Sequence, residues 1–70
     1  MAQTYTAIIK QDGEWWYGWI EEIQGVNCQE STREDLIETL KVTLSEAIEL
    51  NRQDARSFAG ENYRELPIAV

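Results

Sequence analysis

The stretch that decides the fold reads Gly13-Glu14-Trp15-Trp16-Tyr17-Gly18-Trp19-Ile20. Its β-favouring aromatic residues predict a single β-strand. Side chains alternate between the two faces of a strand, so both faces of this one carry large apolar groups. A chain of 70 residues has material to cover one face of a sheet. We therefore expect the other face to meet something outside the chain, which favours a binding or assembling module over an enzyme.

The length predicts one domain covering residues 1–70, near the lower limit for a chain that folds alone. The apolar content of 43% is ordinary for a globular protein, and no apolar run is long enough to cross a membrane. The N-terminal residues Met1-Ala2-Gln3-Thr4 show no secretory signal pattern, and the single Cys28 fits a reducing compartment. These features predict a soluble cytoplasmic domain.

The charge narrows the class of partner. Thirteen acidic residues against six basic ones give a net charge of −7, and the basic residues are scattered. Because nucleic-acid binding depends on cationic contacts to phosphate, we expect no direct nucleic-acid binding by this chain. A basic protein partner fits better, since complementary charge steers encounter. The alternative is that the acidity serves only solubility.

The absence of histidine excludes several kinds of chemistry. Without it the chain has no Ser-His or Cys-His nucleophile pair and no zinc site of the common kinds. The adjacent carboxylates Glu21-Glu22 and Glu34-Asp35 are typical of solvated charge, and the glycines do not form a phosphate-binding loop. We expect no enzymatic activity, no catalytic residue, no cofactor and no metal.

Residues on either side of the aromatic strand predict an antiparallel meander. Asp12-Gly13 between two β-rich runs is a strong hairpin signal, and Gly25 gives the next connector backbone freedom. The three predicted strands cover residues 4–10, 15–21 and 26–29.

A helix is predicted over residues 33–52. Thr32 stands three residues before Asp35, as a capping-box variant, and acidic residues in the first turn suit the helix dipole. Whether the helix continues past Arg52 to a stop at Gly60 stays open, because the spacing of Ala55 and Phe58 allows it. The residues expected to form its buried stripe are Leu36, Ile37, Leu40, Leu44, Ala47 and Ile48.

The segment 63–70 ends in an apolar run interrupted by Pro67, which has no backbone donor. It is expected to be an edge strand, or a strand beginning after Pro67. A right-handed crossover by the helix would let it pair in parallel beside the first strand. The predicted fold class is therefore α+β, with the order β-β-β-α-β and one long helix on one sheet face.

The chain resembles the HicB antitoxin family over residues 4–50. The resemblance lies in the aromatic-glycine hairpin, in Ile23-Gln24-Gly25-Val26-Asn27-Cys28 and in Ser31-Thr32-Arg33-Glu34-Asp35-Leu36 opening the helix. Gln24 stands where that family usually has a proline. The resemblance implies a truncated RNase H-like fold and an antitoxin that binds and blocks HicA, a small basic RNase toxin, in a type II toxin–antitoxin system.

Two hypotheses follow for the exposed aromatic residues. In the first, they capture a basic toxin; in the second, the chain is a homo-oligomeric orphan domain, structural or regulatory, without a toxin partner. Gly18 would permit close approach of the helix, which favours placing Trp15, Tyr17 and Trp19 on the face away from it. One set of contact candidates is Trp16, Ile20 and Ile23; the set on the other face is Trp15, Tyr17 and Trp19. The partner-binding residues we select are Trp15, Tyr17, Trp19 and Ile23.

Overall fold

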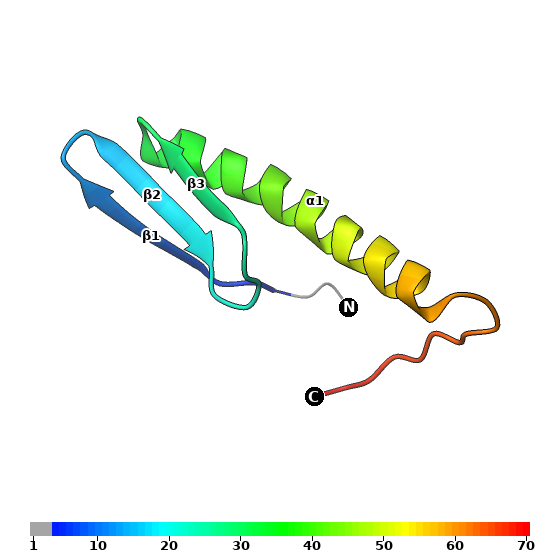
Figure 1. Ribbon diagram of the computed structural model, residues 1–70. Coiled ribbons are helices and arrows are strands. Elements are labelled where there is room, and N and C mark those ends of the chain that lie inside the picture. Colours follow the sequence, from blue (N-terminus) through cyan, green and yellow to red (C-terminus); the bar gives the residue numbers. More distant parts are fainter. Residues whose placement is uncertain (1–3) are drawn as a thin grey trace.

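The computed structural model describes residues 4–70, so the N-terminal residues 1–3 considered above lie outside it. Within the described chain, three antiparallel strands are followed by one long helix, which is an α+β arrangement (Figure 1). The elements are β1 (Ala7–Asp12), β2 (Trp15–Ile20), β3 (Asn27–Glu30) and α1 (Arg33–Ala59).

The sheet is a meander with the order β1-β2-β3, as the hairpin signals predict. Asp12 lies opposite Trp15, so a two-residue turn joins β1 to β2. Gly13 in this turn has a φ of 62°, a left-handed conformation that glycine adopts without steric cost. The turn therefore fixes the register of the whole hairpin.

Helix α1 begins and ends at recognisable caps. The Thr32 hydroxyl accepts a hydrogen bond from the backbone N–H of Asp35 at 3.1 Å, which confirms the predicted N-cap. At the other end Gly60 has a φ of 76°, and its N–H donates to the carbonyl of Arg56 at 3.2 Å. The helix thus continues past Arg52 to Ala59, the longer of the two ends that the sequence allowed.

The core lies where α1 crosses the centre of the sheet. A Cβ on Gly18 would lie 2.8 Å from Leu40 Cδ1 and 3.2 Å from Leu36 Cδ2, so the helix packs directly on the backbone of β2. Ile20 and Val26 complete the fully buried cluster. The other predicted stripe residues are half-buried, namely Ile37, Leu44, Ala47 and Ile48.

The C-terminal strand expected beside β1 is not seen, because residues 60–70 form no strand. Residues 53–59 belong to helix α1 instead. They make the helix roughly 10 Å longer than one that ends at Arg52, so the C-terminal segment begins that much further along the helix axis. The chain then reverses at Gly60 and runs back below the helix end (Figure 1). One exposed ion pair, between Arg56 Nε and Glu65 Oε1 at 3.2 Å, ties it to the helix.

A valine at Gly18 tests this packing. We expect Gly18→Val to destabilise the fold by roughly 1–3 kcal/mol, because the added methyl groups would overlap Leu36 and Leu40. The matched control is Gln29→Val, which adds a β-branched residue to β3 on the face away from the helix and should change stability by less than about 0.5 kcal/mol. Urea unfolding of both variants measures the difference, and equal stabilities would contradict the packing.

Candidate functional site: the outer face of the sheet

The face of β2 that points away from α1 carries three large aromatic side chains. Because Gly18 faces the helix, alternation places Trp15, Tyr17 and Trp19 on the opposite face, as predicted. Trp15 is 46% exposed and Trp19 38% exposed, while Tyr17 is half-buried between its neighbours. No element within residues 4–70 covers this row.

The strand register supplies the neighbours of this row. Ile8 and Asn27 lie on either side of Trp19, and Lys10 and Gln29 lie on either side of Tyr17. Three of these four neighbours are polar, so the arrangement is an apolar centre with a mainly polar margin, which is the anatomy of a protein interface. We call this surface the outer face; it consists of Ile8, Lys10, Asp12, Trp15, Tyr17, Trp19, Asn27 and Gln29.

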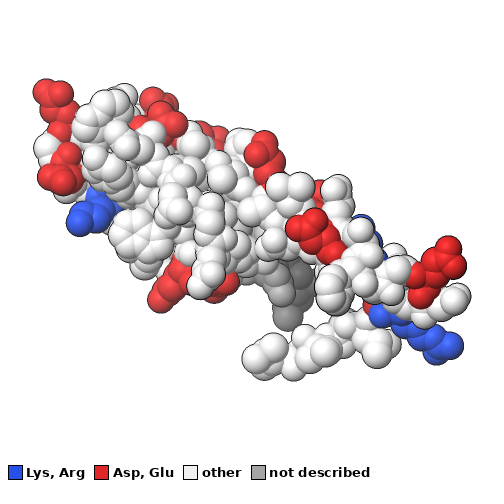
Figure 2. Space-filling view, viewed as in Figure 1, with Lys and Arg blue, Asp and Glu red and all other residues white. Residues whose placement is uncertain are grey.

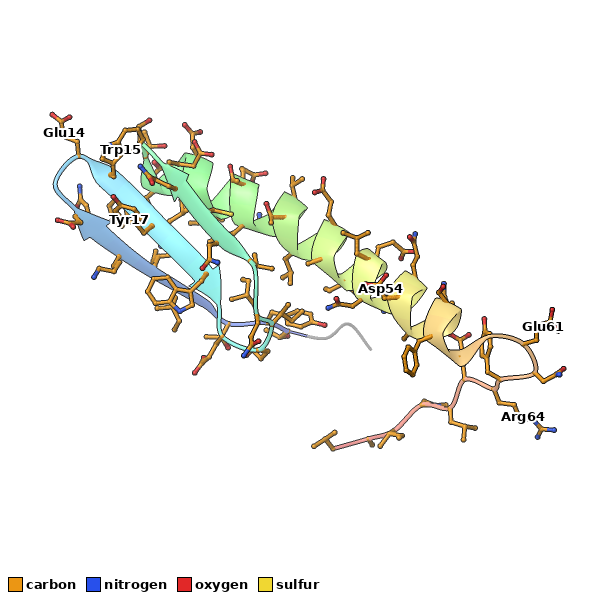
Figure 3. All side chains as sticks on the ribbon, viewed as in Figure 1. Glu14, Trp15, Tyr17, Asp54, Glu61 and Arg64 are labelled. Carbon is orange, nitrogen blue, oxygen red and sulfur yellow. The ribbon has the colours of Figure 1, made fainter. Side chains whose placement is uncertain are left out.

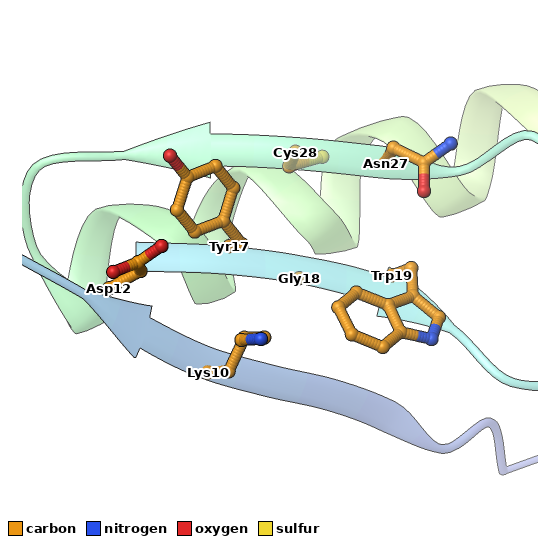
Figure 4. A pocket seen from close by; sticks show the side chains of 7 residues that line it. All are labelled: Lys10, Asp12, Tyr17, Gly18, Trp19, Asn27 and Cys28. Carbon is orange, nitrogen blue, oxygen red and sulfur yellow. The ribbon is translucent and has the colours of Figure 1, made fainter. Parts of the chain in front are cut away.

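A shallow depression of about 360 Å³ lies in the outer face between Tyr17 and Trp19 (Figure 4). It forms because Gly18, the residue between the two aromatic rings, faces the helix and leaves only backbone at its floor. Lys10 and Asp12 border the depression from β1, and Asn27 borders it from β3. The depression can therefore accept an apolar group while a cation and an anion lie at its rim.

Ile23, the fourth predicted contact residue, lies apart from this row. It lies between β2 and β3, where it is half-buried and packs against the core cluster. Trp16 is also half-buried and packs against that cluster, and Ile20 belongs to it. The structure therefore brings together Trp15, Tyr17 and Trp19 but not Ile23.

Acidic residues stand at both ends of the aromatic row. Glu14 lies in the turn beside Trp15 (Figure 3), and Glu21 and Glu22 follow β2 directly after Ile20. In the space-filling view, acidic side chains lie mainly around the edge of the molecule and uncharged atoms fill its centre (Figure 2). A cationic partner would thus be attracted to the margins of an apolar contact surface.

The described residues include one thiol and two pairs of adjacent carboxylates. Residues 4–70 hold no group of three or more His, Cys, Asp and Glu side chains placed to bind a metal ion. The thiol of Cys28 faces α1, with Sγ 3.6 Å from Thr43 Oγ1. Of the adjacent carboxylates, Glu22 accepts a hydrogen bond from the N–H of Thr6 at 2.8 Å.

Within residues 4–70, no helix combines the length and apolar character needed to cross a membrane.

Comparison with known proteins does not place the chain in a family. No family model matches it, and the searches of curated proteins and of solved structures find no match either.

The residues that flank the aromatic row are the part of the site that the sequence analysis missed. Lys10 and Ile8 face outward because the hairpin register sets them opposite Tyr17 and Trp19. The signal was present in the sequence, since the two-residue turn after Asp12 determines which residues of β1 and β2 are partners.

The hydrogen bond from Thr6 lowers the pKa of the Glu22 carboxyl, because it stabilises the charged form. Its stabilising contribution is full above the pKa of an unfolded glutamate and is lost as the pH falls through the lower folded pKa. We expect an NMR titration to find Glu22 below the ordinary glutamate value. In Thr6→Pro, which lacks the donor, the pKa should return to that value; an unchanged pKa would contradict the contact.

Proposed function

We propose that this chain is a protein-binding module that takes a basic partner on its outer face. The observation that carries the proposal is the row of Trp15, Tyr17 and Trp19, aligned on one face of the central strand and left open by the helix. Exposed apolar patches with polar rims mark interaction sites. Tryptophan and tyrosine are also the residues most enriched among those that dominate binding energy.

The charge of the chain supports a basic partner. The outer face itself carries one cation and one anion, Lys10 and Asp12, so its centre is close to neutral. The excess of negative charge, −7 overall, lies elsewhere and includes Glu14, Glu21 and Glu22 at the ends of the aromatic row. Such a layout lets aromatic contacts hold the complex while the surrounding charge speeds encounter.

The partner that the sequence resemblance implies is a small basic RNase toxin of the HicA type, and the chain would then act as its antitoxin. The observed β-β-β-α order agrees with the first part of the truncated RNase H-like arrangement expected for such an antitoxin. The mechanism is steric: the toxin surface docks on the outer face and its active site is blocked, with no bond made or broken by this chain.

The alternative partner for the same face is another copy of the chain. Two outer faces in contact would remove Trp15 and Trp19 from water in an orphan domain without a toxin. Apolar burial contributes about 25 cal/mol per Å² before the costs of association, so either occupant would stabilise the face. Pairing two outer faces would bring together the acidic residues at the ends of the two rows, Glu14, Glu21 and Glu22, and their repulsion favours a basic partner for this face.

The test is binding to the product of a neighbouring gene that encodes a small basic protein, measured by calorimetry and by light scattering. We expect Trp19→Ala to weaken the complex by at least tenfold, because the side chain borders the depression at the centre of the face. Raising the salt from about 0.15 to 0.5 M should also weaken it by screening the flanking acids.

Val42→Ala is the matched control, because Val42 is an exposed apolar residue on helix α1. It should leave the affinity unchanged. A complex that Val42→Ala weakens as much as Trp19→Ala would overturn the assignment to the outer face. Failure to form any complex with a basic neighbour would overturn the antitoxin proposal.

A further inference from the structure

A second apolar surface lies at the other end of the molecule. Beyond Ile48, residues 49–59 extend α1 by roughly 16 Å past its last core contacts, and all of them are exposed. Phe58 is 96% exposed, although it follows Leu40 by 18 residues, about five turns, and so lies on the core-facing side of the helix. The segment 63–70, which we call the tail, adds exposed Leu66, Ile68 and Val70.

The helix extension and the tail make the molecule more extended than a compact domain of this length. The radius of gyration is 15.2 Å, whereas a compact chain of this length has about 11 Å. Ordering a segment costs conformational entropy, and exposed apolar side chains return nothing to offset that cost. The helix extension and the tail are therefore expected to pack against something else.

Within the described chain, the sheet has an uncovered apolar groove and an unpaired strand edge along β1. Helix α1 packs over β2 and β3 rather than β1, which leaves an apolar groove of about 200 Å³ beside β1. Within residues 4–70 nothing pairs with the outer edge of β1. The groove is lined mainly by Tyr5, Ala7, Ile37, Leu40 and Leu44.

The backbone of β1 defines what can pair there. Glu21 donates its N–H to the carbonyl of Thr6 at 2.9 Å, so by alternation Ala7 and Ile9 direct their backbone groups to the free edge. The side chains of these two residues face the helix side, where Ile9 packs on the core and Ala7 lines the groove. A strand added antiparallel to β1 would thus bond through Ala7 and Ile9, and its residues opposite these two would place their side chains on the helix side, where the groove lies.

The tail has the pattern that this edge requires. Leu66, Ile68 and Val70 alternate with Pro67 and Ala69, so a strand here has one apolar side of large residues. In the antiparallel arrangement the large residues bond to β1, and the nitrogen of Pro67, which has no hydrogen, faces away from it. In a parallel arrangement Pro67 would face β1 and leave a bond unmade.

The chain's own tail fits this site poorly. β1 and β3 run in the same direction, α1 runs back, and the tail reverses again, so it is parallel to β1 (Figure 1). Glu65 is held beside Arg56, about 18 Å along the helix from Leu44, and residues 66–70 span about 17 Å. The tail therefore reaches only the near end of the groove, and with the wrong direction.

We propose that the tail of a second copy adds to the β1 edge, antiparallel, with Leu66, Ile68 and Val70 in the groove. Each copy has one tail and one groove, so a two-fold exchange satisfies both and closes the assembly as a dimer. The contact uses the edge of β1 and the helix side of the sheet, and it leaves the outer face free. It does not depend on the function proposed for that face.

The test measures the mass of the full chain by sedimentation over a range of concentrations, with charged variants of the tail. We expect the unaltered chain to be a dimer. Ile68→Asp should raise the dimer dissociation constant at least tenfold, because it places a charge in the apolar groove. The matched control Ala69→Asp adds the same charge to the neighbouring residue, which faces away from the groove, and should change the constant by less than about threefold.

A variant on the accepting side completes the test. Ala7→Pro removes an N–H that faces the free edge and leaves the bonds between β1 and β2 in place, so it should weaken the dimer as Ile68→Asp does. Circular dichroism reports whether each variant keeps its helix. A monomeric unaltered chain, or a dimer that responds equally to Ile68→Asp and Ala69→Asp, would overturn the proposal. A dimer lost only with Trp19→Asp would also overturn it, because it would place self-association on the outer face.

Discussion

The contact of Leu36 and Leu40 with the backbone of Gly18 is the constraint on which the structure depends. A side chain at that position would hold the helix away from β2, whereas glycine lets the two leucines reach the strand itself. The fully buried cluster of the described chain forms at this contact. The stability of so small a domain therefore depends on a short length of helix, roughly from Leu36 to Ala47.

The same contact determines both exposed surfaces. Because Gly18 faces the helix, strand geometry sends Trp15, Tyr17 and Trp19 to the other side, where no second layer exists within residues 4–70. Because the helix is centred over β2 and β3, it leaves the groove beside β1 open. A chain with one helix covers half of one sheet well, and its remaining apolar surface is available to partners.

Local signals in the sequence predicted most of this arrangement. They could not predict whether the C-terminal segment pairs with β1, because that contact joins residues far apart in the chain. The Asp12-Gly13 turn, the Thr32 cap and the spacing of Leu36 and Leu40 act over a few residues, and the structure confirms them. The helix end was ambiguous because Gly60 is a stop signal, while the helical spacing past Arg52 gave no earlier one. Whether residues 63–70 pair with β1 depends on where the helix ends and on the direction in which the chain then runs. The pattern of residues within the segment does not contain that information.

Strand β1 contributes to both the outer face and the groove beside its free edge, because its successive residues point to opposite sides of the sheet. Ile8, Lys10 and Asp12 belong to the outer face, whereas Ala7 and Ile9 present the free edge. A strand added at that edge would place Pro67 and Ala69 on the same side as the outer face, extending it by one strand beside Ile8 and Lys10. Dimerisation through the tail would thus enlarge the surface that we propose for a basic partner. Each of the two copies would then present a four-stranded outer face in which β1 is no longer an edge strand.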